Sequence, residues 1–283
     1  MFRLNRFLGA LALLLAPVAA QAEDARAELA LMGTVPIYWG EAAGLDDLLS
    51  GAAPPHWARG VLEEDFTLVP LDYLSAEALA EHRFLLLAQP RGFSPEENVA
   101  LDRWVREGGT LLLFADPMMT GESRFHLGDR RRPQDVTLLS PILAHWGLEL
   151  VFDAQQAGGL RMVDHFGDAL PVNMRGELRP LGEAGSCGIP GEGLLAHCVI
   201  GKGQALIVAD AAMLDIEGPH ENAETALRWL VGHVFGDQLA ENGDGAGNGL
   251  PESPQTPEIR VEPPLGQGMD RAHHEERVEG YSP

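Results

Sequence analysis

Continuous apolar runs alternate with amphipathic stretches through the middle of the chain. Residues 84–88 and 110–115 read Phe-Leu-Leu-Leu-Ala and Thr-Leu-Leu-Leu-Phe-Ala. Runs of this kind are typical of parallel strands that are covered on both faces. Between them, Leu101, Trp104 and Val105 are spaced i, i+3, i+4, which indicates the buried stripe of a helix. This strand–helix–strand order predicts parallel strands joined by crossover helices.

The ends of this central helix are marked by capping residues. Ser94 suits the N-cap, Pro95 suits the first helical position, and Glu97 completes a capping box. Gly108 and Gly109 follow the last periodic residue, where the chain needs a left-handed conformation that glycine adopts without steric cost. We therefore expect the helix to begin after Ser94 and to end before Gly108.

The same patterns predict further elements on both sides. Strands are expected at 66–71, 148–152 and 203–210, and helices at 75–82, 137–147 and 222–235. The helix at 137–147 should bury Leu138, Leu139, Ile142, Leu143 and Trp146. The last helix should bury Ala223, Ala226, Leu227, Leu230, Val231 and Val234. The glycine-rich segment 158–203 contains short strands and turns, so we expect a small β-rich insertion there.

Both ends of the chain differ from this core. Arg3 and Arg6 precede an apolar run over 7–16 and an Ala-x-Ala site, which predicts a signal peptide over 1–22 that is cleaved after Ala22. The run is too short to span a bilayer, and no later segment is long and apolar enough to do so. Residues 237–283 are acidic and rich in Gly and Pro, which predicts a disordered tail. The sequence thus predicts one α/β domain over 23–236 in an exported, soluble, periplasmic protein.

The net charge limits the partners that the chain can bind, and the two cysteines predict a disulfide bond. The net charge is −22, and it becomes −24 once Arg3 and Arg6 leave with the signal peptide. Such a charge repels nucleic acid and anionic lipid, so we expect no nucleic-acid partner. It suits a partner with a basic face, although a solvated surface explains it equally well. In an oxidising compartment, Cys187 and Cys198 are expected to form a disulfide bond.

Polar residues follow two of the apolar strands. Asp116 ends the strand at 110–115 and Asp210 ends the strand at 203–210, with Asp215 beyond it. Because parallel strands point their carboxyl ends to one edge, Asp116 and Asp210 are expected to share a crevice where a ligand could bind. The alternative is that each aspartate only caps the turn that follows its strand.

A long loop over 115–136 carries a second candidate site. Arg130, Arg131 and Arg132 place three guanidinium groups in a strongly acidic chain, and such groups bind carboxylate or phosphate. A solvated loop whose arginines pair with nearby acids is the alternative.

The sequence does not contain the motifs of several common kinds of active or binding site. The strand at 110–115 leads into Asp-Pro-Met-Met, so no nucleophile elbow is present there. Six histidines are scattered without the spacing of a metal site: His126, His145, His165, His197, His220 and His233. Gly201-Lys202-Gly203 precedes a strand and not a helix, so it does not form an anion-binding helix terminus. We expect no catalytic residue, metal or cofactor.

The segment from 84 to 117 resembles the core of the gliding-motility-type ABC-transporter auxiliary domain (DUF4350-like), which is related to the glutamine-amidotransferase-like superfold. Its helix opening at 94–97, Gly108-Gly109 and Leu111–Asp116 carry the resemblance, as does the later Gly-strand-Asp segment with its closing helix. The resemblance covers about 80–236, and 29–79 loosely. It implies an open, mostly parallel flavodoxin-like sheet with helices on both faces, and a domain without the amidotransferase nucleophile.

Family members are often membrane-anchored parts of an ABC export system, whereas this chain has a cleavable signal. The expected function is therefore a non-catalytic, soluble periplasmic binding or scaffolding protein. Its expected partners are ABC-transporter components or other envelope proteins. Two alternatives stay open: an enzyme that acts on a sugar or peptide through Asp116 and Asp210, and a solute-binding protein that uses the loop over 115–136.

Overall fold

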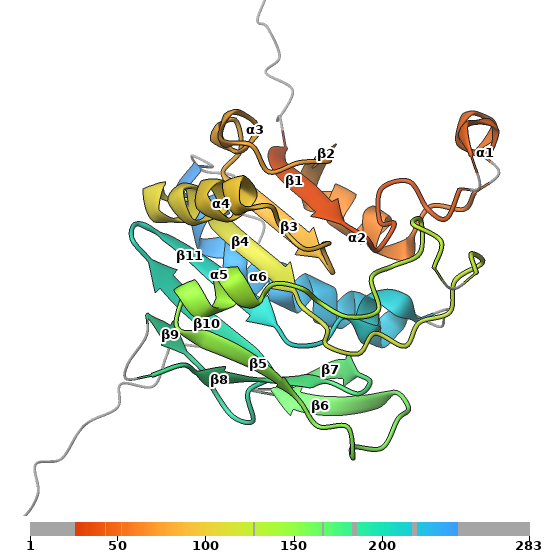
Figure 1. Cartoon of the computed structure of the whole chain (residues 1–283). Helices are drawn as coiled ribbons and strands as arrows, with labels where there is room; N and C mark the ends of the chain where they lie inside the picture. Colours follow the sequence, from red (N-terminus) through yellow and green to blue (C-terminus); the bar gives the residue numbers. More distant parts are fainter. Residues whose placement is uncertain are drawn as a thin grey trace, which may run out of the picture. The chain divides into compact units, whose positions relative to one another are not determined.

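The computed structural model describes residues 26–42, 44–51, 53–126, 128–165, 167–182, 186–216 and 220–242. The expected signal peptide and nearly all of the expected tail lie outside these residues, so both stay predictions. Figure 1 shows the α/β core that the described residues form.

A seven-stranded sheet lies at the centre, in the order β2-β1-β3-β4-β11-β10-β9. Its strands are β1 (Ala27–Gly33), β2 (Phe66–Pro70), β3 (Phe84–Ala88), β4 (Thr110–Phe114), β11 (Gly203–Val208), β10 (Leu195–Ile200) and β9 (Cys187–Gly188). The first five strands in the order are parallel, and β10 and β9 extend the sheet in antiparallel fashion. The sheet is therefore mostly parallel, as the sequence predicts.

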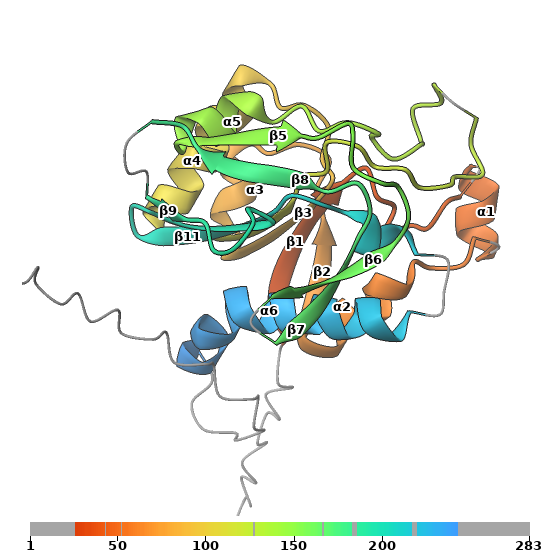
Figure 2. The same ribbon diagram turned by 90° about the horizontal axis from the view of Figure 1, so that it is seen from below.

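Helices cover both faces of the sheet (Figure 2). On one side lie α2 (Trp57–Asp65) and α6 (Glu221–Asn242), and on the other lie α3 (Ala76–Ala80), α4 (Pro95–Glu107) and α5 (Ser140–His145). The strands serve both layers because successive side chains alternate: Leu112 and Phe114 pack into the first core, while Leu111 and Leu113 pack into the second. This arrangement confirms the flavodoxin-like fold class.

The β-rich region contains two further pairs of strands. β5 (Leu148–Phe152) pairs with β8 (Gly176–Pro180), and β6 (Arg161–His165) forms a hairpin with β7 (Asp168–Val172). The hairpin lies against α6 and adds Leu170 and Val172 to the core on that side. The predicted insertion is thus only partly separate, because its last two strands, β9 and β10, belong to the main sheet.

The helix boundaries differ from the expectation in two places. α5 begins at Ser140, so Leu138 precedes it and is exposed, contrary to the prediction that it is buried. The closing helix continues to Asn242, past the domain boundary predicted at 236. Two short elements, α1 (Leu45–Ser50) and a 3-10 turn at Ala212–Asp215, complete the described structure. Among the helices described, none is long and apolar enough to cross a membrane.

Candidate functional site

The carboxyl ends of the parallel strands form the edge at which α/β proteins bind ligands. The chain order reverses between β1 and β3, and a crevice is expected outside the carboxyl ends at such a switch point. Here the loop over 115–136 crosses that edge: the Met119 N–H donates to the Asp135 carbonyl at 2.8 Å, and the Thr137 N–H donates to the Asp116 carbonyl at 2.9 Å.

Gln89 fills the switch point. It follows β3 with a φ of 49° and is fully buried. Its side-chain oxygen accepts from the Asp116 N–H at 2.8 Å, and its amide nitrogen donates to the carbonyls of Asp116 at 2.9 Å and Gln134 at 2.8 Å. The Thr34 hydroxyl, after β1, donates to the Gln89 carbonyl and accepts from the Gln134 N–H. The crevice is therefore occupied by the protein's own polar groups.

Asp116 and Asp210 lie side by side just beyond β4 and β11, as the sequence predicts, and both are almost completely buried. Asp116 accepts from the N–H groups of Met118 at 2.7 Å and Ala211 at 3.0 Å. Asp210 accepts from the N–H groups of Ala212 at 2.8 Å and Asn173 at 3.0 Å. Each of the four carboxylate oxygens thus has a backbone donor.

Burial, which disfavours the charged form, raises the pKa of Asp116 to about 6, and the N–H donors from Ala211 and Met118 oppose the shift. The pKa of Asp210 is also raised, first by burial and then by the neighbouring charge of Asp116. Close aspartates with perturbed pKa values indicate an enzyme site when they line a concave pocket. Neither residue lines the cavities described below, and their hydrogen bonds are those of the turn-capping alternative.

The three arginines do not converge. The Arg131 guanidinium donates to Asp129 at 2.6 and 3.0 Å and lies 4.1 Å from the centre of the Phe125 ring. Arg132 points inward and donates to the carbonyls of Gly121 at 2.9 Å and Phe125 at 3.3 Å. Arg130 is exposed. Arg131 and Arg132 therefore bind within the loop itself. Arg132 supplies the donors for two loop carbonyls, which need partners when water is excluded.

A cavity of about 320 Å³ lies at the same edge. Four separate segments line it: the chain after β1, the turn before α2, the loop over 115–136, and the turn between β11 and α6. The lining residues are Val35, Pro36, Gly40, Glu41, Pro54, Pro55, His56, Trp57, Glu122, Arg124, Pro133, Leu214, Asp215, Ile216 and His220. A second cavity, of about 450 Å³, lies between α3 and α4, away from the strand ends.

His56 and Trp57 fix one wall of the cavity at the strand ends. The His56 Nδ1 accepts from the Ala58 N–H at 3.1 Å and caps α2, while its Nε2 donates to the Leu214 carbonyl at 2.7 Å. Burial, and to a lesser degree the nearby His220, lower the pKa of His56 against the effect of the Leu214 bond, so the ring is neutral at pH 7. Trp57 stacks on His220 with ring centres 5.4 Å apart. Among the described residues, neither Trp57 Nε1 nor His220 Nδ1 has a hydrogen-bond partner.

This cavity is the feature that the sequence did not predict. Its walls come from segments that are separated by up to 185 positions, from Val35 to His220. The one local signal is Pro54-Pro55-His56-Trp57, a rigid turn with a capping residue directly before a helix.

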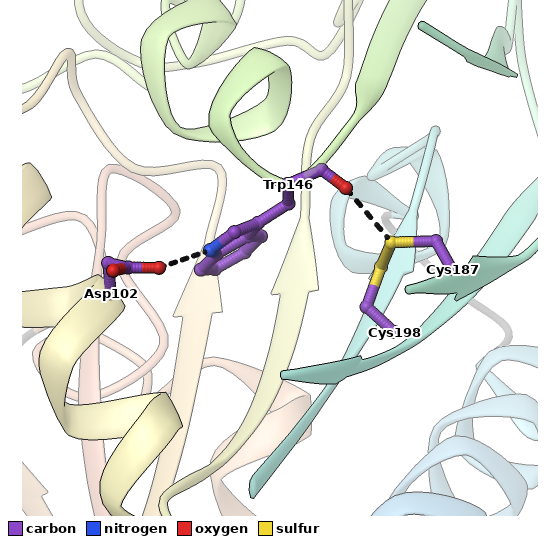
Figure 3. The surroundings of a disulfide bond; sticks show 4 residues. All are labelled: Asp102, Trp146, Cys187 and Cys198. Atoms are coloured by element: carbon purple, nitrogen blue, oxygen red, sulfur yellow. Dashed lines mark hydrogen bonds between the residues drawn. A yellow bond between two sulfur atoms is a disulfide. The ribbon is translucent and has the colours of Figure 1, made fainter. Parts of the chain in front are cut away.

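The cysteines form the expected disulfide bond (Figure 3). Cys187 of β9 and Cys198 of β10 are direct cross-strand partners. The Cys187 sulfur lies 3.5 Å from the carbonyl oxygen of Trp146, and the Trp146 indole donates to Asp102 of α4 at 2.9 Å. The bond is therefore structural and lies outside the strand-end site. The described residues hold no group of three or more His, Cys, Asp or Glu side chains suited to a metal ion.

Residues 33–157 match a family described as an ABC-type uncharacterized transport system. This match confirms the resemblance to an ABC-transporter auxiliary domain. The matched residues include β3, α4 and β4, the loop over 115–136, and the segment 36–57 that lines the cavity. No match is found among curated protein sequences.

Several solved structures are similar in fold. An exo-β-1,4-mannosidase from Opitutaceae bacterium strain TAV5 has a TM-score of 0.47 and 15% identity, covering 75% of this chain and 36% of that one. A β-galactosidase from Bacillus circulans sp. alkalophilus has a TM-score of 0.42 and 15% identity, covering 76% and 32%. A putative ThuA-like protein from Bacteroides uniformis has a TM-score of 0.43 and 11% identity, covering 78% and 98%. The chain thus spans about a third of the length of the two glycosidases, and the similarity concerns the fold alone.

Proposed function

We propose that the chain is a non-catalytic periplasmic protein that binds or scaffolds components of an ABC-type transport system. The observation that carries this proposal is the family match over 33–157, which includes the switch point and most of the cavity wall. An auxiliary protein of this kind acts through its surface, so its strand ends need no reactive group.

The arrangement at the strand ends supports the non-catalytic part of the proposal. Covalent catalysis needs an exposed nucleophile beside a base, and here β4 leads into Asp116 and Pro117. The switch-point crevice is filled by Gln89. The enzyme alternative is tested by screening the purified chain for glycoside and peptide hydrolysis: turnover that is lost in Asp116→Asn would overturn the proposal.

The disulfide bond supports an oxidising compartment, where such bonds form and persist. We expect the chain to be released with the periplasmic fraction, with a mature N-terminus at Glu23 after removal of 1–22. Fractionation of producing cells and N-terminal mass spectrometry test this point. A chain that stays in the cytoplasm with Met1 intact would contradict it.

The auxiliary role is tested by chemical cross-linking in the native host, followed by purification of the tagged full-length chain. We expect subunits of an ABC-type transporter to be enriched over a control in which an unrelated exported protein carries the same tag. If no transporter subunit is enriched, the auxiliary role is wrong.

The cavity favours solute binding as a second candidate function, because the loop over 115–136 supplies Glu122, Arg124 and Pro133 to its wall. A solute that binds the folded chain and not the unfolded one raises its melting temperature, and the rise grows with the logarithm of ligand concentration over Kd. A thermal-shift screen of small amines, amino acids and sugars tests this candidate, with Trp57→Ala as the variant that should lose the shift.

A further inference from the structure

Side-chain contacts join the segment that follows β1 to the loop over 115–136: Glu41 accepts from Ser123 and Arg124, and Asp47 of α1 pairs with Arg124. We propose that the surface around these contacts docks a basic, apolar segment of a partner protein, with a Lys or Arg side chain entering the cavity beside Trp57. The proposal rests on the proposed function and names the chemistry of the contact. We call this the docking surface: Trp39, Leu45 and Leu49 together with the cavity lined by Glu41, Trp57, Glu122 and Asp215.

The apolar part of the docking surface is unusually open to solvent. Trp39, Leu45 and Leu49 are 57%, 68% and 77% exposed, and they fall within a stretch of 11 residues. Leu45 and Leu49 are four residues apart on α1, so they lie on the same side of that helix. In Figures 1 and 2, α1 stands out from the sheet and its helices. Single exposed leucines are normal, but three large apolar side chains that are this open within so short a stretch favour a protein-binding surface.

The charged residues that line the cavity indicate which kind of partner binds. The cavity is lined by three carboxylates, those of Glu41, Glu122 and Asp215, and by one guanidinium, that of Arg124. Arg124 is already engaged, since it lies 3.7 Å from Asp47 of α1 and donates to the Glu41 carbonyl at 3.0 Å. The surface is therefore net acidic in a chain of net charge −22, and it attracts a basic segment.

Hydrogen bonds hold the two halves of the docking surface in place. The Glu41 carboxylate accepts from the Ser123 hydroxyl and from the Arg124 N–H, the latter at 2.9 Å. The Arg124–Asp47 pair then ties α1 to the same loop. Because the contact residues are positioned before any partner arrives, less conformational entropy is lost when the partner binds.

The size of the surface favours a peptide segment over a free solute. A small molecule inside the cavity of about 320 Å³ would leave Leu45 and Leu49 uncovered, because both lie on α1 and neither lines the cavity. A second copy of this chain would bring Asp46 and Asp47 against the same acids. A basic side chain that enters the cavity is attracted by the carboxylates at its wall.

The proposal is tested by calorimetric titration of the full-length chain with a synthetic helical peptide that carries leucines and arginines on the same face. We expect binding that is weakened about tenfold or more in the Leu45→Ser/Leu49→Ser variant and in Glu122→Gln. The matched control, Leu160→Ser/Leu181→Ser, removes two exposed leucines elsewhere and should bind like the wild type. A peptide with glutamates in place of the arginines should not bind.

Equal affinity in the wild type and the Leu45→Ser/Leu49→Ser variant, or no binding by either, overturns the proposal. Tight binding of free arginine that is unaffected by the leucine changes also overturns it, in favour of a solute site. Repeating the cellular cross-linking with the same variant separates the two proposals. Capture of transporter subunits that does not depend on the leucines refutes the docking surface and leaves the auxiliary role standing. Peptide binding that depends on the leucines, without capture of transporter subunits, supports the docking surface and refutes the auxiliary role.

Discussion

Asp116 and Asp210 are two acids that serve the structure of the strand ends. Each accepts two backbone N–H groups, and together they connect the ends of β4 and β11 with Asn173 in the turn between β7 and β8. Their placement at one edge follows from strand order and could be predicted from the sequence. Their enclosure could not, because it depends on a loop that returns over them from residue 117 onward.

The raised pKa of Asp116 predicts a pH dependence of stability. A carboxyl group with a folded pKa of about 6 and an unfolded value near 3.8 binds more protons in the folded state between these pH values. Its stabilising contribution is therefore complete below about pH 4 and is lost as the pH rises through 6.

In Asp116→Asn the side chain at position 116 cannot ionise. Between about pH 4 and pH 7, the free energy of unfolding of this variant should therefore decrease less than that of the wild type. Urea denaturation of both proteins across this range measures the difference. Parallel curves for the two proteins would show that Asp116 does not titrate in this way.

Gln89 is the residue on which the closed switch point depends. Gln89→Ala removes the acceptor of the Asp116 N–H and the donor to the Asp116 and Gln134 carbonyls. The Asp116 carbonyl keeps the Thr137 N–H, but the buried Asp116 N–H loses its acceptor. A buried group left without a partner costs about 1–3 kcal/mol, so the free energy of unfolding should fall by about 1 kcal/mol or more. Hydrogen exchange should also accelerate across the loop over 115–136. Unchanged exchange in that loop would mean that Gln89 does not hold it.

At the scale of elements, the sequence pattern was most informative where strands are buried on both faces. β3, β4 and β11 appear as continuous apolar runs for that reason, and the capping box of α4 is present as predicted. β1 also lies inside the sheet but was not predicted, because its buried apolar run is only the four residues Leu29–Met32 and follows the polar Glu28. α2 was missed because it buries only Ala58, Val61 and Leu62.

The disulfide bond is expected to hold the two-residue strand β9 against β10. Cys187→Ser/Cys198→Ser should lower the free energy of unfolding by about 3 kcal/mol, since the bond closes a short loop in the unfolded chain. Hydrogen exchange should accelerate at Val199, whose N–H donates to the Ser186 carbonyl at 2.8 Å. Titration of the unfolded, unreduced wild type should find no free thiol, and two free thiols would refute the bond.

At the scale of the whole molecule, the described structure places its recognition features at one edge of the sheet. The cavity, the loop over 115–136 and α1 all lie at the carboxyl ends of the parallel strands. The start of β1 and the end of α6 lie toward the opposite edge (Figure 1). The sequence predicted the edge from strand order. It could not predict the cavity, which is assembled from four distant segments, nor the inward turn of Arg132, which follows from carbonyls that become buried only in the folded loop.

The most direct test of the account is photo-cross-linking in the native host, with a photoreactive residue in place of Leu49 in the full-length chain and Leu181 as the control position. The account predicts an adduct with a subunit of an ABC-type transport system at position 49 and none at position 181. The absence of a transporter adduct at position 49, or the same adducts at both positions, would contradict it.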